Sequence, residues 1–101
     1  MWGTIAKMRM KPDVSADYVI AQMNAFDRKR IGGWVSMSLY RADADSREIW
    51  MVGMFDSKES YQANAESSAQ HSIFTMLRSW LEEDPVWHDV EHLLSLDEAN
   101  H

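Results

Sequence analysis

The sequence contains no cysteine, no long apolar run and no excess of basic residues. Without cysteine the chain forms no disulfide and uses no thiol chemistry, which is compatible with a reducing compartment. No apolar stretch approaches the roughly 20 residues that a membrane-spanning helix needs. The formal net charge of −6 argues against a general affinity for nucleic acid or anionic membrane. We therefore expect no nucleic-acid partner and no membrane association.

Recognisable signals for targeting, metals and nucleotides are missing as well. Charged residues interrupt the only apolar stretch near the start, MWGTIAKMRMK, so we expect no signal peptide. The acidic turn 42–46 lacks the glycine and the terminal glutamate of a calcium loop. His88 and His92 share one face of a predicted strand, but at roughly 3.3 Å per residue they lie about 13 Å apart, too far to chelate one metal. We expect a cytoplasmic protein that uses neither metal nor cofactor.

What the chain does have is apolar and aromatic side chains. Hydrophobic residues make up 46% of its 101 residues, and five Trp, three Tyr and three Phe are among them. This content suffices for the core of one small domain. We expect a single domain over residues 1–101, in which 97–101 form a loose tail.

Hydrophobic periodicity predicts six elements. Alternating apolar side chains predict strands over 2–11, 34–41, 48–55 and 86–96. A period close to four predicts a helix over 14–30, which Asp13 or Ser15 can cap and which Gly32–Gly33 can end.

A second helical segment follows the third strand. Asp56 with Glu59 has the spacing of a capping box, and Ser67 with Gln70 repeats it, so we expect a kink or a new helix start within 66–69. Beyond that point one apolar face, which Pro85 terminates, contains Ile73, Phe74, Leu77, Trp80 and Leu81.

The order βαββαβ predicts an α+β fold, the ferredoxin-like plait, with a four-stranded antiparallel sheet and two helices on one face. Strand 48–55 is apolar on both sides, because Ile49 and Met51 point one way and Trp50 and Val52 the other. Two helices cover only one of these sides. We therefore expect a homodimer that pairs through the open sheet face, although the sequence does not say which face of strand 48–55 meets the partner.

Three segments carry a resemblance to a known family. The runs MWGTIAKMRMKP, REIWMVGMFDSKESYQANAESSAQH and LEEDPVWHDVE resemble the antibiotic-biosynthesis-monooxygenase-like family of dimeric α/β barrels, close to its uncharacterised actinobacterial-type members. The resemblance covers residues 2–96 and implies a barrel of two subunits, each with a pocket between sheet and helices. It departs from the family pattern at Val90, where a glycine is expected after Trp-His-Asp.

The resemblance implies three kinds of activity: cofactor-free oxygenation of polycyclic aromatic ketones, quinol oxidation and heme degradation. It argues against the last of these. Ala6 and Asn64 stand near the positions that heme-degrading members fill with asparagine and tryptophan, and His71 does not align with their histidine.

Five residues are candidates for a site. His71, near the start of the restarted helix, is the candidate base, since imidazole has an ordinary pKa of about 6.5 and accepts a proton near neutral pH; its alternative is a histidine that caps or packs. Asn64 precedes the kink, where it binds substrate or satisfies interrupted helix backbone. Tyr40, Trp50 and Trp87 are candidate walls of a flat aromatic pocket, in which Tyr40, like Asn64, can hydrogen-bond the substrate; core or dimer packing is the alternative for Tyr40 and Trp50.

Two hypotheses about function remain open. The first is a cofactor-independent monooxygenase that acts on a hydrophobic aromatic or quinonoid molecule, with His71 as the base that forms a substrate carbanion. The second is a non-catalytic dimeric protein that binds small molecules or is associated with stress. A pocket without an organised acid–base group favours the second.

Overall fold

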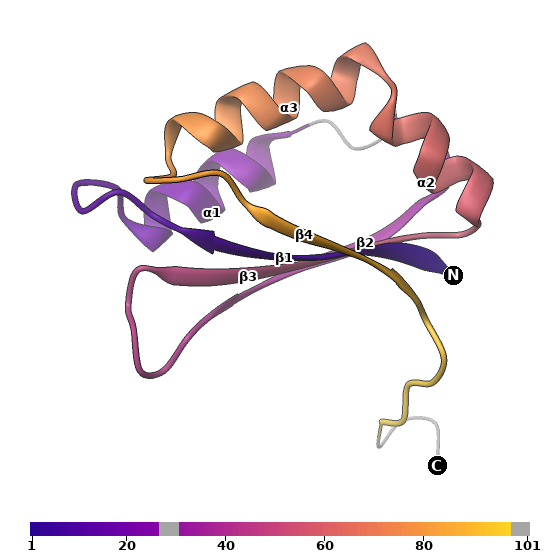
Figure 1. Cartoon of the computed structure of the whole chain (residues 1–101), viewed down its shortest axis with the longest axis horizontal. Helices are drawn as coiled ribbons and strands as arrows, with labels where there is room; N and C mark the ends of the chain where they lie inside the picture. The colour runs from indigo at the N-terminus through magenta and orange to yellow at the C-terminus, as the bar shows by residue number, and fades with distance from the viewer. Residues whose placement is uncertain (27–30, 98–101) are drawn as a thin grey trace.

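The computed structural model describes residues 1–26 and 31–97. Over these residues an antiparallel sheet of order β2-β3-β1-β4 carries all the helices on one face (Figure 1). The prediction of an α+β ferredoxin-like plait is confirmed, with the second helical segment divided in two. The strands are β1 (Trp2–Arg9), β2 (Trp34–Arg41), β3 (Glu48–Phe55) and β4 (Val86–Glu91), and the helices are α1 (Ala16–Ala25), α2 (Lys58–Ala65) and α3 (Ser68–Ser79).

The core lies between the sheet and the helices. The two central strands, β1 and β3, pair over their whole length and turn alternate side chains toward α1 and α3. Burying an aliphatic or aromatic side chain contributes about 1.5–3 kcal/mol, so this cluster supplies most of the packing energy. Its buried members are Ala6, Met8, Met10, Val19, Ile49, Leu77, Trp80 and Leu81.

The opposite face of the sheet carries no described helix (Figure 1). Because strand side chains alternate, Trp50, Val52 and Met54 of β3 point to this open face while Ile49 and Phe55 are buried under the helices. The sequence left undecided which side of β3 faces away from the helices, and the structure identifies it as the side of Trp50, Val52 and Met54.

Helix α1 is shorter than the predicted 14–30. Ser15 caps it, as one of the two candidates, by accepting a hydrogen bond of 3.1 Å from the Tyr18 backbone N–H. The helix ends at Ala25, well before the glycine pair that was predicted to end it, and residues 27–30 lie outside the described part of the chain. Gly33, at φ 77°, instead makes the turn into β2, where its carbonyl accepts from the Asp56 N–H at 2.8 Å.

The predicted restart of the second helical segment is confirmed, but its first cap is one residue off. Ser57, and not Asp56, caps α2, because the Ser57 hydroxyl accepts from the Ser60 N–H. Ser67 caps α3 in the predicted way, by accepting from the Gln70 N–H at 3.0 Å. The chain therefore bends between Ala65 and Ser68.

Strand β4 ends at Glu91, five residues before the predicted end. Its ladder with β1 ends where Glu91 lies opposite Trp2, and the His92 N–H donates to the Met1 carbonyl just beyond it. Leu93 and Leu96 beyond it are mostly exposed. At its other end β1 is also shorter than predicted, since Met10 leaves the ladder and forms an isolated bridge with Leu81. The predicted tail 97–101 falls outside the described residues except for Asp97.

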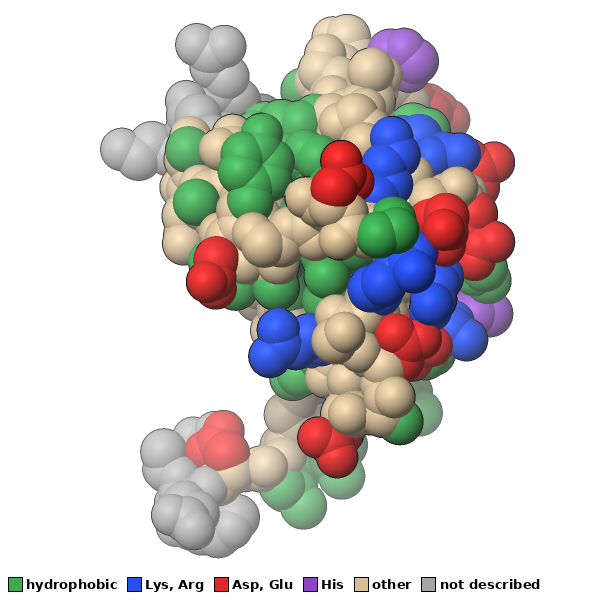
Figure 2. All heavy atoms as spheres, turned by 90° about the vertical axis from the view of Figure 1, so that its left-hand side faces the viewer, with side chains coloured by type: hydrophobic (Ala, Val, Ile, Leu, Met, Phe, Trp, Pro, Cys, Tyr) green, Lys and Arg blue, Asp and Glu red, His purple; other side chains and the backbone are tan. Residues whose placement is uncertain are grey.

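One end of the molecule is rich in charge. Figure 2 shows basic and acidic side chains interleaved there. Arg9 of β1 is paired with Asp45 in the β2–β3 turn and with Glu82 after α3, the second contact at 3.2 Å. The hydrogen bond from Arg9, followed by that from the Arg47 backbone N–H, lowers the pKa of Asp45 below its ordinary value. These contacts join the β2–β3 turn to the segment after α3.

No helix within the described ranges is both long and apolar enough to cross a membrane.

Candidate functional site

A cavity of about 520 Å³ opens between the sheet and the two helices α2 and α3. Its lining is mostly apolar, and one glycine, Gly53 of β3, leaves room at its floor. Cavities of this size and character accommodate small organic molecules. Six aromatic side chains contribute to the walls, namely Phe26, Trp34, Phe55, Tyr61, Phe74 and Trp87.

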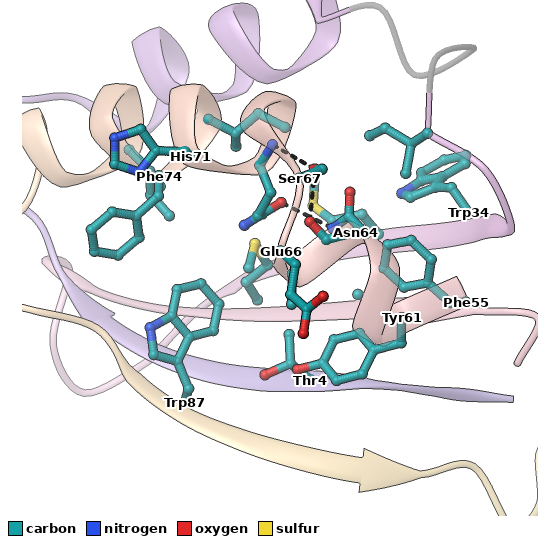
Figure 3. A pocket seen from close by; sticks show the side chains of 18 of the residues that line it. Thr4, Trp34, Phe55, Tyr61, Asn64, Glu66, Ser67, His71, Phe74 and Trp87 are labelled. Atoms are coloured by element: carbon teal, nitrogen blue, oxygen red, sulfur yellow. Dashed lines mark hydrogen bonds between the residues drawn. The ribbon is translucent and has the colours of Figure 1, made fainter. Parts of the chain in front are cut away.

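The break between α2 and α3 brings polar groups to the cavity. Ser67 both caps α3 and donates a hydrogen bond of 2.7 Å to the Asn64 carbonyl, which the helix end leaves without its usual partner. The Asn64 side-chain amide donates to Gln70 Oε1 at 3.1 Å. All three residues line the cavity, and Figure 3 shows Asn64 and Ser67 next to each other. Asn64 therefore lies where substrate binding was predicted, and it also serves the interrupted helix, the alternative for this residue.

A second cluster of polar side chains lies where α2 passes over β1 and β4. The Tyr61 hydroxyl donates to the Asp89 carboxylate, and the Thr4 hydroxyl donates to the His88 carbonyl at 3.2 Å. Figure 3 shows the Tyr61 hydroxyl next to Thr4 at the floor of the cavity. Burial, and then the hydrogen bond to Asp89, raises the pKa of Tyr61 to about 12, so its phenol stays protonated at neutral pH.

His71 lies on α3 at the rim of the cavity, and its side chain is exposed. Figure 3 places its ring next to Phe74, on the side of the cavity away from Tyr61. Among the described residues no hydrogen bond or ion pair involves its imidazole, whereas its carbonyl accepts from the Thr75 hydroxyl at 3.0 Å. The candidate base thus reaches the cavity, but no neighbouring group orients it.

Trp87 lies where the sequence predicted a wall. It is on β4 with its ring 6.4 Å from that of Phe74, so the two close one side of the cavity between sheet and helix. At 38% exposure the Trp87 ring still leaves one surface open to a ligand or to solvent.

Tyr40 and Trp50 do not line this cavity. They face each other across β2 and β3 on the open face of the sheet, where Tyr40 is 60% exposed and Lys7 lies 5.9 Å from the centre of the Trp50 ring. Strand alternation turns them away from the helices, so their interpretation as walls of this cavity does not hold. Their position fits the alternative, packing against a second copy.

Sequence reasoning missed Thr4, Tyr61 and Asp89. Tyr61 lies three residues before Asn64, a spacing that puts both on one face of a helix, and this was the available signal. The pairing of Thr4 with Asp89 depends on the register of β1 against β4, which the sequence does not reveal. No group of three or more potential metal ligands occurs in residues 1–26 and 31–97.

Solved structures share this architecture across almost the whole chain, although no protein-family model and no curated protein matches the sequence. SnoaB, a cofactor-independent oxygenase from Streptomyces nogalater, superimposes with a TM-score of 0.75 at 15% identity, over 96% of this chain and 97% of its own. A Bordetella bronchiseptica protein provisionally named an antibiotic biosynthesis monooxygenase gives 0.75 at 17% identity, over 92% and 97%. A Chloroflexus aurantiacus protein with the same provisional name superimposes with a TM-score of 0.70 at 22% identity, over 95% of this chain and 96% of its own. The chain has the antibiotic biosynthesis monooxygenase fold. At these identities the likeness is one of fold, and the resemblance seen in the sequence is confirmed at that level.

Proposed function

We propose that the protein is a cofactor-independent monooxygenase of the antibiotic-biosynthesis-monooxygenase-like family, and that its substrate is a hydrophobic aromatic or quinonoid molecule. The observation that carries this proposal is the aromatic-walled cavity of about 520 Å³, in a fold shared with a cofactor-independent oxygenase. Flat aromatic walls favour planar ligands, because offset stacking adds to the gain from burial.

The proposed reaction requires few functional groups from the protein. A base removes a proton from an acidic ring CH₂, and the carbanion transfers an electron to O₂; the two radicals then combine to a peroxide, which loses water to leave a carbonyl. In sum, one CH₂ and one O₂ give one C=O and one H₂O. The protein has to bind the ring, accept the proton and exclude bulk water.

In this proposal His71 accepts the proton, Asn64 holds a polar substituent and Trp87 forms a wall. The support is positional: all three line the cavity, and they come from α3, α2 and β4. An exposed imidazole at the rim can return its proton to solvent after each turnover.

We further propose that the protein works in the cytoplasm as a homodimer, paired through the face of Trp50, Val52 and Met54. Support comes from the helices, which in the described ranges all cover the other face, and from the apolar side chains that β3 turns to this one. A sheet with an uncovered apolar face is a typical interface.

A non-catalytic binding protein is the second candidate, and a specific observation favours it. The His71 imidazole has no partner among the described residues, whereas catalytic bases are normally oriented by a second group. The same cavity would then hold a ligand without converting it.

The test compares turnover of an anthrone by parent protein, His71→Ala and Asn64→Ala, using colourless protein treated with chelator. Loss of a general base typically lowers the rate by about 10²–10⁴-fold. His92→Ala is the matched control, because that exposed ring contacts Ser95 beyond β4 and is absent from the cavity lining. Unchanged turnover in folded His71→Ala would remove the base role, and no turnover across a panel of aromatic substrates would favour the binding protein.

A further inference from the structure

The side chains of Thr4 and Tyr61 lie with the Asp89 carboxylate on one wall of the cavity. Thr4 donates to the His88 carbonyl and Tyr61 to the Asp89 carboxylate, and both acceptors belong to β4. A hydroxyl group has one proton and two lone pairs. With the protons used in this way, the acceptors on this wall are the remaining lone pairs of the Thr4 and Tyr61 oxygens, which lie close enough to hydrogen-bond each other, and the Asp89 carboxylate.

The local structure holds this arrangement in place. Thr4 is only 8% exposed and sits in the central strand β1, directly opposite Asp89 in the ladder with β4. Tyr61 is held by its helix and by its ring contact with Phe55, 5.7 Å between centres. A reversed Tyr61 hydroxyl would lose a hydrogen bond to a charged group, which is among the stronger kinds.

The charged groups around Tyr61 also favour a ligand that donates a hydrogen bond. Asp89 accepts its proton, and Glu66, at the end of α2, points its carboxylate into the cavity (Figure 3). Lys58 lies one helical turn before Tyr61 on α2; its ammonium group is 4.8 Å from the centre of the Trp2 ring, and it does not line the cavity. His71 is on the far side. Among the residues that the structure describes, this part of the wall therefore offers acceptors without a competing cation.

We infer that Thr4 and Tyr61 form a subsite that recognises a hydrogen-bond donor on the ligand, and that the ligand is an aromatic molecule with a free phenolic or enolic hydroxyl group. The subsite selects hydroxyarenes and hydroquinones over quinones and aryl ethers, which present only acceptors. Where the reaction is concerned, the inference rests on the proposed function and narrows its substrate class. Binding itself does not depend on turnover.

The experiment compares two probes of the same ring, 2-naphthol and 2-methoxynaphthalene, which differ in whether the oxygen carries a proton. Titrations followed by tryptophan fluorescence under argon give Kd for each probe without oxygen chemistry. One additional hydrogen bond predicts that 2-naphthol binds about 2- to 10-fold more tightly to the parent protein. The double variant Tyr61→Phe/Asp89→Asn removes the hydroxyl without freeing the Asp89 carboxylate, which also lines the cavity, and should lose most of this preference by weakening 2-naphthol alone. Tyr18→Phe, outside the cavity lining, should keep it.

Asp89→Asn gives a second test that retains the tyrosine. An asparagine amide can donate to the Tyr61 oxygen and so release the tyrosine proton into the cavity, which should shrink or reverse the preference. In the parent protein, the ¹³Cζ resonance of Tyr61 should shift with 2-naphthol and stay in place with its methyl ether.

Equal affinities in the parent protein, an undiminished preference in Tyr61→Phe/Asp89→Asn, or no saturable binding of either probe would each overturn the inference. The outcome is separable from that of the proposed function. If 2-naphthol is preferred but anthrone is not converted, the subsite is supported and the oxygenase proposal is contradicted. If anthrone is converted without any preference for 2-naphthol, the oxygenase proposal is supported and the subsite is contradicted.

Discussion

The Tyr61 hydroxyl on α2 donates a hydrogen bond to Asp89 on β4, and so connects the helix after β3 to an edge strand across the central β1. This contact closes one end of the cavity and fixes which way the tyrosine proton points. It also ties the titration of Tyr61 to the stability of the fold.

We predict that the free energy of unfolding falls at high pH because Tyr61 loses its proton there. Its pKa is raised from 10.0 to about 12, first by burial and then by Asp89, so the folded chain holds this proton more tightly than the unfolded chain. The resulting stabilisation is complete below pH 10 and is lost as the pH rises from about 10 to 12. Urea unfolding across this range should show a smaller loss for Tyr61→Phe than for the parent protein. Tyr18→Phe should follow the parent, and parallel curves for Tyr61→Phe would contradict the prediction.

Two glycines on neighbouring strands should respond oppositely to alanine. A Cβ on Gly3 would lie 1.8 Å from the Gly53 carbonyl oxygen, whereas a Cβ on Gly53 would meet no atom within 4 Å. Gly3→Ala should therefore cost about 1–3 kcal/mol, as overpacking typically does. Gly53→Ala should leave the free energy of unfolding nearly unchanged and weaken ligand binding several-fold, because its methyl group enters the cavity.

Chemical denaturation and probe titration on both variants test the pair. A Gly53→Ala variant that binds 2-naphthol with the parent's affinity would place the ligand elsewhere.

A charge on the open sheet face should dissociate the proposed dimer. Val52 lies in the centre of β3 on that face, so Val52→Asp would place a carboxylate in the apolar interface. We expect Val52→Asp to sediment as a monomer at micromolar concentration while the parent protein sediments as a dimer. Ile20→Asp is the control, since Ile20 is a half-exposed residue of α1 on the helix side. A monomeric parent protein would refute the interface.

How far the sequence predicts this molecule depends on whether a feature is local. Alternation along β2 and β3, and the Ser67 cap, are properties of short segments, and each was predicted at its observed position. The ends of α1 and β4 depend on tertiary contacts that a short segment does not reveal: the ladder of β4 with β1 ends where Glu91 lies opposite Trp2.

The same distinction explains the site. His71, Asn64 and Trp87 line the cavity, a position that helical periodicity and aromatic content predicted, while their roles stay predictions. Tyr40 and Trp50 were assigned to the wrong side because a strand that is apolar on both faces does not reveal which face the helices cover. Tyr61 and Asp89 meet only through pairing of segments that are 28 residues apart.

The last prediction concerns the helix break that shapes the cavity. Ser57 and Ser67 cap α2 and α3 by the same kind of contact, to Ser60 N–H at 3.1 Å and to Gln70 N–H at 3.0 Å. Replacing either by alanine should cost about 1 kcal/mol of stability, the typical loss for such a cap. Only Ser67 also donates to the Asn64 carbonyl, and only the Ser67 end carries the Asn64–Gln70 hydrogen bond.

Ser67→Ala should therefore release Asn64 and weaken probe binding, while Ser57→Ala lowers the melting temperature by a similar amount and leaves the affinity unchanged. Melting curves and 2-naphthol titrations on the two variants separate the effects, since a general loosening of the fold would change both affinities alike. Equal affinities in Ser67→Ala and Ser57→Ala would mean that the orientation of Asn64 does not matter to the ligand, and Asn64 would then serve only the interrupted helix.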